Sequence, residues 1–299
     1  MIYNPTANSY FTGAGLIDIG LQQAGVKVQQ SLDLDRNAVD TMRINPRYFG
    51  HRLLQRDMKE VEAMDQPESD IMIGTYPCNR YSDISALYGL LTGDELFLHF
   101  FRMLAIRRPE MYVVENVPGM KRFPVVMEAM TKLPGYYVNV FCPVDASNWL
   151  PQRRERLILI GTKKPFTISA PTKSSLIPTI KDILEPYAQV EVNDTVIARI
   201  KGEYRDLPIV VDPEDPASLA PTCVAHYAKD MGTRLVKDKS YPYGLRPFTI
   251  REYARLQGVP DDFIFPNYRY SYRLIGNGVA VPKARWIGEQ AIKYFNSKN

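Results

Sequence analysis

Residues 94 to 115 read DELFLHFFRMLAIRRPEMYVVE, and this stretch decides the fold. Its first part, Asp94 to Arg107, has apolar residues at helical spacing and predicts a helix. Its last part, Met111 to Glu115, is a short apolar run typical of a strand. Similar runs occur at Asp70 to Gly74 and at Arg156 to Gly161. Strands that alternate with helices predict an α/β fold with a doubly wound, mostly parallel sheet.

The sequence changes character after this α/β part. Residues Pro165 to Pro247 are rich in proline and weakly periodic, which predicts a smaller, loop-rich module with some β structure. A helical pattern returns at Thr249 to Leu256, and a final helix is predicted from Pro282 to about Phe295. Such a helix could pack back on the first part of the chain. We therefore predict one domain from residues 1–165 and 271–299 and a second from residues 166–270.

Composition restricts the class of protein. With 299 residues, 45% of them hydrophobic and 23% charged, the chain has the composition of a globular protein. It contains no run of eighteen apolar residues, and its N-terminus lacks the order of a signal peptide, so we expect a cytoplasmic protein with no membrane partner. Cys78, Cys142 and Cys223 are widely spaced, which predicts reduced thiols and no metal site.

Charge is unevenly distributed along the chain. Residues 1 to 100 contain 8 Lys and Arg against 13 Asp and Glu, and the remainder contains 29 against 20. A polyanion would therefore dock on the later part. Solvated surfaces produce similar asymmetries, so charge alone leaves both interpretations open.

A glycine-rich segment near the N-terminus has features of a nucleotide site. Phe11-Thr-Gly-Ala-Gly-Leu-Ile-Asp-Ile-Gly20 places small residues at a strand-to-helix turn, although its spacing departs from the dinucleotide fingerprint. Asp33 follows about twenty residues later, where a second strand should end and a ribose is typically held. Asp57 and the turn before Cys78 would share the same sheet edge. Alternatively, the glycines only shape a turn and Asp33 caps a helix at Arg36 to Met42.

Five further segments resemble, in order, motifs of the cytosine-5 DNA methyltransferase family of bacterial or phage type. They are Tyr76-Pro-Cys78, Glu115-Asn-Val117, Gln152-Arg-Arg-Glu-Arg156, the segment from Arg246 to Phe263, and Ile275-Gly-Asn-Gly-Val279. With the glycine segment, the match extends from Phe11 to about Pro282. The resemblance implies a Rossmann-like, S-adenosylmethionine-dependent fold in which residues 166–270 recognise the target sequence.

The chemistry of cytosine methylation explains these residue types. C5 of cytosine is a poor nucleophile until a thiolate adds at C6, and Cys78 is the candidate thiolate. Glu115 can hydrogen-bond the N3 and N4 edge of the base and, if protonated, donate to N3. The resemblance further implies that Arg156 contacts O2 of cytosine. It makes Arg154 a supporting residue in the same strand, with its side chain pointing the same way.

The resemblance also implies the cofactor, S-adenosylmethionine, which would leave as S-adenosylhomocysteine. The residues expected to hold it are Phe11, Gly13, Gly15, Asp33, Leu34, Asp57, Pro77, Asn277 and Val279. Several positions depart from the family pattern, among them the segment from Gly276 to Pro282. Tyr76 and Asn79 flank the Pro-Cys pair, and Leu34 stands where relatives often have an aromatic residue.

Methylation inside a duplex requires the base to be flipped into a pocket. We therefore expect the protein to have a surface that binds double-stranded DNA. Residues 79 to 93 predict a loop that closes over DNA, with Arg80 and Ser82 facing it. The segment Ala220-Pro-Thr-Cys-Val-Ala225 resembles the family's short strand near DNA, which makes Thr222 a candidate contact. Arg234 and Lys237 are candidate phosphate ligands.

Other functions remain open at this point. A tRNA cytosine is an alternative substrate for the same fold, and a catalytically silent DNA-binding relative is an alternative from another class. A dinucleotide oxidoreductase would leave Cys78, Glu115 and Arg156 unexplained. We expect a monomer, with a separately acting restriction endonuclease as a possible partner in the cell.

Overall fold

The computed structural model describes residues 2–77, 95–202, 205–206, 209–266 and 268–297. The chain forms two compact units. Unit 1 consists of Met1–Asp145, Glu155–Pro171 and Val281–Asn299, and unit 2 of Ala146–Arg154 and Thr172–Ala280. These bounds differ from the predicted division in three segments. Residues 146–154 and 271–280 belong to the smaller unit, and residues 166–171 belong to the larger one. No helix within the described ranges is long and apolar enough to cross a membrane.

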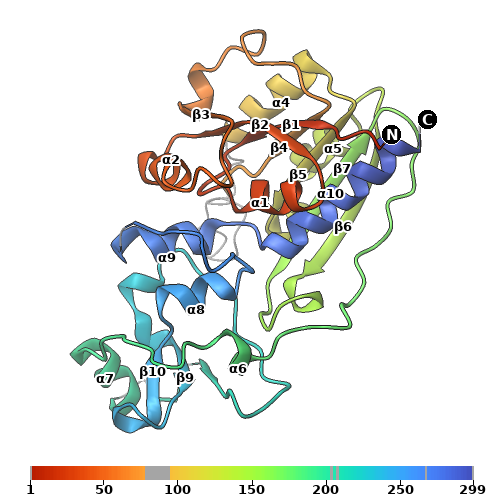
Figure 1. Ribbon diagram of the computed structural model, residues 1–299. Helices are drawn as coiled ribbons and strands as arrows, with labels where there is room; N and C mark the ends of the chain where they lie inside the picture. Colours follow the sequence, from red (N-terminus) through yellow and green to blue (C-terminus); the bar gives the residue numbers. More distant parts are fainter. Residues whose placement is uncertain (1, 78–94, 203–204, 207–208, 267, 298–299) are drawn as a thin grey trace. The chain divides into compact units, whose positions relative to one another are not determined.

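Unit 1 is built on a seven-stranded sheet with the order β3-β2-β1-β4-β5-β7-β6 (Figure 1). The strands are β1 (Thr6–Tyr10), β2 (Lys27–Asp33), β3 (Arg52–Gln55), β4 (Ile71–Gly74), β5 (Met111–Asn116), β6 (Tyr137–Asp145) and β7 (Glu155–Thr162). The first five run parallel, and β7 pairs antiparallel with both β5 and β6. The predicted mostly parallel sheet is confirmed.

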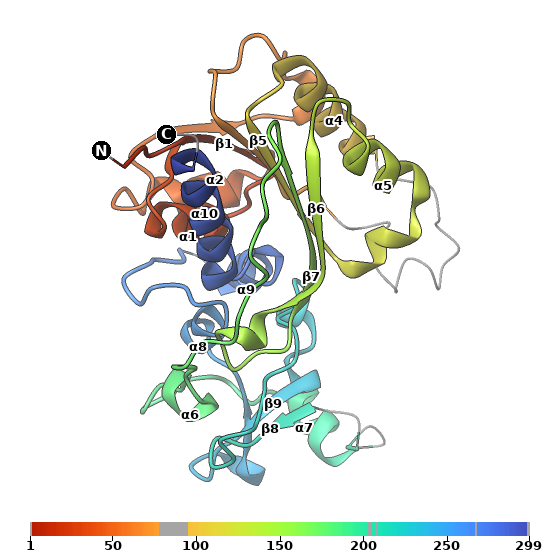
Figure 2. The same ribbon diagram turned by 90° about the vertical axis from the view of Figure 1, so that its right-hand side faces the viewer.

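Helices cover both faces of this sheet. They are α1 (Leu16–Gln23), α2 (Arg36–Arg43), α4 (Glu95–Arg107), α5 (Pro124–Thr131) and α10 (Val281–Asn296). Figure 2 shows α1, α2 and α10 on one face and α4 and α5 on the other, which is the doubly wound arrangement. The last helix does pack back on the first, because a Cβ on Gly20 of α1 would lie 2.4 Å from the Val281 carbonyl oxygen.

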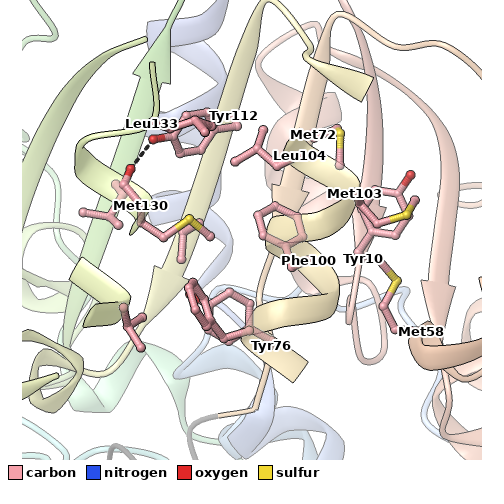
Figure 3. Packing of buried hydrophobic residues seen from close by; sticks show 14 of the residues in the cluster. Tyr10, Met58, Met72, Tyr76, Phe100, Met103, Leu104, Tyr112, Met130 and Leu133 are labelled. Carbon is pink, nitrogen blue, oxygen red and sulfur yellow. Dashed lines mark hydrogen bonds between the residues drawn. The ribbon is translucent and has the colours of Figure 1, made fainter. Parts of the chain in front are cut away.

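The core beneath α4 is rich in aromatic and methionine side chains (Figure 3). Tyr76 belongs to it, since its side chain is only 2% exposed and its ring lies 6.0 Å from that of Phe100. The hydroxyl of Tyr112 donates to the Met130 carbonyl, so the polar end of this second buried tyrosine is satisfied. A tyrosine before the Pro-Cys pair thus fills the interior of unit 1.

Unit 2 has a three-stranded sheet with the order β10-β9-β8. Its elements are α6 (Ile180–Ile183), α7 (Asp194–Lys201), β8 (Ile209–Val211), β9 (Arg234–Lys237), β10 (Leu245–Pro247), α8 (Ile250–Arg255) and α9 (Tyr268–Asn277). Three buried tyrosines form part of its core: the rings of Tyr227 and Tyr253 are stacked 4.7 Å apart, and Tyr272 meets both edge-on. The predicted loop-rich module with some β structure is confirmed.

Candidate active site

The candidate site of unit 1 lies at the carboxyl ends of its parallel strands. Strand order reverses direction between β1 and β4, and open α/β sheets bind ligands in the crevice at such a switch point. The sequence-predicted residues that follow or end these strands are Phe11, Gly13, Gly15, Asp33, Leu34, Asp57, Pro77 and Glu115. They therefore share one edge of one sheet.

The turn between β1 and α1 has an unusual backbone. Phe11, Gly13 and Gly15 all adopt left-handed conformations, with φ of 61°, 59° and 76°. At Gly15 glycine is also required by packing, because a Cβ would lie 2.4 Å from the Phe49 ring. At Gly13 a Cβ would have no atom within 4 Å, so the backbone there borders open space. Gly13 is the point at which a ligand can approach the main chain.

The end of β2 is bonded to this turn through Asp33. One carboxylate oxygen accepts the Gly13 N–H at 2.7 Å and the other accepts the Asp35 N–H at 2.8 Å. Burial raises the pKa of Asp33 above its usual range. The cap of α2 is Asp35, whose side chain accepts the Asn37 N–H, so the helix-cap interpretation applies to Asp35 and not to Asp33.

These residues fit a nucleoside cofactor. A carboxylate has about four lone-pair positions, so Asp33 can accept ribose hydroxyls in addition to its two backbone donors. Leu34 next to it is 61% exposed and offers an apolar surface for a base. Asp57 follows β3 and accepts the Lys59 N–H at 3.0 Å. In the described ranges, no group of three or more His, Cys, Asp or Glu could hold a metal ion.

Two side chains connect the end of β4 to its neighbours. The Thr75 hydroxyl donates to the Phe11 carbonyl at 2.8 Å, and the Asn116 amide donates to the Tyr76 carbonyl at 3.1 Å. The backbone just before residue 78 is therefore fixed to both the glycine turn and the end of β5. Pro77 is exposed. The predicted residues Cys78, Arg80 and Ser82 lie outside the described residues.

Glu115 and Arg156 form an ion pair. Glu115 lies opposite Ile158 in the antiparallel β5–β7 ladder, so Arg156, two residues from Ile158, shares its face. The Arg156 Nε lies 3.2 Å from Glu115 Oε1, and the side chains are only 13% and 9% exposed. Arg156 also donates through Nη1 to the Glu155 carbonyl. A guanidinium carries five N–H donors, so further donors can reach a base.

The prediction for Arg154 is wrong in its geometry. β7 begins at Glu155, so Arg154 precedes the strand, and its side chain is enclosed within unit 2 at 2% exposure. Its guanidinium donates to the backbone carbonyls of Cys223, Gly276 and Gly278 at 2.8 to 3.0 Å. The alternation of side chains along a strand does not apply to Arg154, because this residue lies outside β7.

The predicted cofactor residues at the end of α9 also belong to unit 2. Asn277 is the last residue of that helix and is exposed, whereas the Val279 side chain is 4% exposed. Gly276 before them is required by packing, since a Cβ would lie 2.4 Å from the Val224 backbone. Their part in cofactor binding stays a prediction.

The predicted DNA contacts of unit 2 have partners within that unit. The Thr222 hydroxyl donates to the Arg153 carbonyl at 2.8 Å. The expected strand around it is wrong, because in this segment only Ala220 makes a bridge, to Gln152. Arg234 donates to the Thr233 hydroxyl at 3.2 Å. The Lys237 amine lies 2.6 Å from Asp212, and this hydrogen bond lowers the Asp212 pKa.

Sequence reasoning missed two residues of the glycine segment Phe11 to Gly20, namely Thr12 and Asp18. The Thr12 hydroxyl donates to the Asp18 carboxylate at 2.6 Å, and both side chains are buried. The sequence contains a signal for this pair. An aspartate within the apolar run Leu16 to Leu21 is expected to be buried, and a buried carboxylate needs hydrogen-bond donors nearby.

The sheet with its antiparallel β7, the glycine turn and the acidic residue at the end of β2 define a Rossmann-like, S-adenosylmethionine-dependent methyltransferase. The family model for C-5 cytosine-specific DNA methylases matches residues 6–293. The chain belongs to this family, and it is a DNA cytosine-5 methyltransferase that uses S-adenosylmethionine.

Individual proteins are similar to the chain over nearly its whole length. It is 28% identical to the type II methyltransferase M.Sau96I of Staphylococcus aureus, over 97% of this chain and 76% of that protein. It is also 28% identical to M.Bsp6I of Bacillus sp., over 95% and 98%. The solved structure of the Entamoeba histolytica methyltransferase EhMeth has a TM-score of 0.79 at 15% identity, covering 99% of both chains, and supports the fold.

Proposed function

We propose that Cys78, Glu115 and Arg156 carry out the methylation, and that the edge from Phe11 to Asp57 holds the cofactor. The observation that carries this proposal is the Asn116–Tyr76 hydrogen bond of 3.1 Å. It joins the residue after Glu115 to the residue two positions before Cys78. A nucleophile at position 78 would therefore start from a backbone fixed beside the buried Glu115–Arg156 pair.

Each of the three residues has one role. The Cys78 thiolate adds to C6 of the flipped cytosine, and the electron pair of the C5–C6 double bond moves towards N3. Glu115 hydrogen-bonds the N3 and N4 edge of the base and, once protonated, donates to N3, and Arg156 donates to O2, so both offset the developing negative charge. S-adenosylmethionine, held by the edge from Phe11 to Asp57, would supply an electrophilic methyl carbon to C5 and would leave as S-adenosylhomocysteine. Loss of the C5 proton to a base then expels the thiolate and restores the double bond.

We further propose that unit 2, with the predicted domain of residues 166–270 at its centre, selects the DNA sequence. Its short strands are joined by long connections, and binding residues lie disproportionately on loops that a folded scaffold positions. Thr222, Arg234 and Lys237 are its candidate contacts. Because relatives such as M.Sau96I are named type II methyltransferases, we propose a cognate restriction endonuclease that acts separately.

Transfer of a tritiated methyl group to unmethylated genomic DNA and to bulk tRNA tests the proposal. We expect label in DNA, and we expect Glu115→Gln to lower the rate about 100-fold or more. The control Glu128→Gln changes an exposed glutamate of α5 and should leave the rate unchanged. Full activity of Glu115→Gln would remove Glu115 from the chemistry, and label confined to tRNA would contradict the proposed DNA substrate.

A further inference from the structure

Asp18 is a buried carboxylate that the proposed chemistry does not use. It lies in the first turn of α1 and is 0% exposed, between Ile17 and Ile19, which are 1% exposed. Burying a carboxylate is costly unless it accepts hydrogen bonds. One of its oxygens accepts two, from the Thr12 hydroxyl at 2.6 Å and from the Ser31 hydroxyl at 2.8 Å.

Thr12 lies in the glycine turn itself. Its N–H donates to the Leu32 carbonyl at 3.2 Å, and its own carbonyl accepts the Gly15 N–H at 3.1 Å. The residue is only 4% exposed, so its hydroxyl points inward to Asp18. Because residues on both sides of Thr12 have left-handed backbones, the turn needs external contacts to keep its conformation.

The turn is thus held by two carboxylates. Asp33 bonds the backbone of Gly13 at 2.7 Å, at the position where a ligand can approach. Asp18 bonds the side chain of the preceding residue from the interior. Since Asp18 has no exposed surface, it can act on a ligand only through the residues that it bonds, and Thr12 is the one of these that lies in the turn.

The neighbouring hydrogen bonds keep Asp18 an acceptor. The Ser31 hydroxyl also lies 2.7 Å from His51 Nε2. Since Ser31 gives its only proton to Asp18, the pattern assigns a proton to His51 Nε2, which donates to the Ser31 oxygen. Burial lowers the His51 pKa, in agreement with a neutral ring that has a single N–H.

We infer that Asp18, acting through the Thr12 hydroxyl, is a positioning residue that holds the glycine turn in the conformation that binds S-adenosylmethionine. The inference rests on the proposed function, because it takes this turn as the cofactor site. It assigns Asp18 and Thr12 no contact with the reacting atoms.

Binding of S-adenosylhomocysteine to the full chain, measured by calorimetry, tests the inference without catalysis. Thr12→Val keeps the shape of the side chain and removes the donor. We expect it to raise Kd tenfold or more and to raise the cofactor KM while kcat changes less than threefold. Asp18→Asn should also weaken binding, and the double variant should bind no worse than Thr12→Val.

Ser31→Ala is the matched control, because it removes a hydrogen bond to the same Asp18 oxygen from β2 instead of the turn. Its Kd should stay within threefold of the unchanged chain. A Kd within threefold in Thr12→Val, or an equal loss in Ser31→Ala, would overturn the inference. Asp33→Ala separates the two claims, because unchanged binding in that variant would contradict the proposed cofactor site itself.

Discussion

Tyr76 illustrates how a departure from a family motif is explained by packing. The motif comparison left a tyrosine before Pro77 unexplained, whereas the structure buries it against Phe11, Phe97 and Phe100 at ring separations of 6.0 to 6.2 Å. Its hydroxyl lies 3.6 Å from the Met120 sulfur. The side chain therefore stabilises unit 1 and supports the backbone that leads to Cys78.

Substitutions of Tyr76 should distinguish the contribution of its ring to the free energy of unfolding from that of its hydroxyl. Tyr76→Ala should lower the free energy of unfolding by about 3–5 kcal/mol, as for other large buried aromatic residues. Tyr76→Phe should lower it by much less, about 1 kcal/mol, because it keeps the buried ring and removes only the hydroxyl. Urea unfolding of the three chains measures both values, and equal losses would contradict this account of the side chain.

Asp18 should make stability depend on pH. Burial raises its pKa to about 6 from an ordinary value near 3.8, although the hydroxyls of Thr12, Ser9 and Ser31 lower it, and His51 reaches it through Ser31. A carboxyl whose pKa is raised in the folded chain stabilises that chain when it is protonated. This contribution to the free energy of unfolding reaches its full size below the ordinary pKa of the carboxyl. That stability is lost as pH rises through about 6.

Asp18→Asn removes this titration. The free energy of unfolding of the variant, relative to the unchanged chain, should rise by roughly 2 kcal/mol between pH 4 and pH 7. Urea unfolding at four pH values in this range measures the difference. Parallel curves for the two chains would mean that Asp18 does not titrate as proposed.

At the scale of elements, the sequence predicted individual helices and strands better than their connections. The apolar runs at β4, β5 and β7 and the final helix lie where the patterns placed them. Strand order, the antiparallel insertion of β7 between β5 and β6, and the enclosure of Arg154 depend on contacts between distant segments. Local periodicity contains no information about those contacts.

The packing of α1 on α10 provides a test at this scale. A Cβ on Gly20 would lie 2.4 Å from the Val281 carbonyl and 2.5 Å from the Ala284 Cβ, and both neighbours are buried. Gly20→Ala should therefore lower the free energy of unfolding by about 1–3 kcal/mol through overpacking. The control is Gly50→Ala, where the nearest atom is 3.8 Å away. Thermal unfolding of both variants checks this, and an equally tolerated Gly20→Ala would show that the helices can separate without loss.

At the scale of the whole molecule, bulk charge does not locate the DNA surface. Unit 2 contains 16 Lys and Arg against 14 Asp and Glu, so the positive excess of the later sequence is not concentrated there. The proposed binding of DNA by this unit would then depend on individual side chains. Lys237 would exchange Asp212 for a phosphate, since the two are paired at 2.6 Å.

Salt dependence of DNA binding tests these side chains. Arg234→Ala and Lys237→Ala should each weaken binding and reduce the slope of log K against log salt by about 0.9, the value for one phosphate contact. Lys181→Ala is the control, because Lys181 is also exposed in unit 2 and paired with a carboxylate, Glu214. Slopes that change equally in all three variants would indicate a general charge effect.

The central claim is that Cys78 attacks C6 of a cytosine in DNA. Duplex DNA in which random cytosines are replaced by 5-fluorocytosine contains every recognition sequence, and fluorine cannot leave C5 as a proton does. With S-adenosylmethionine present, the unchanged chain should form an adduct with this DNA that survives denaturing electrophoresis, whereas Cys78→Ser should bind the DNA without forming one. An adduct formed by Cys78→Ser, or its absence with an unchanged chain that methylates ordinary DNA, would contradict the account.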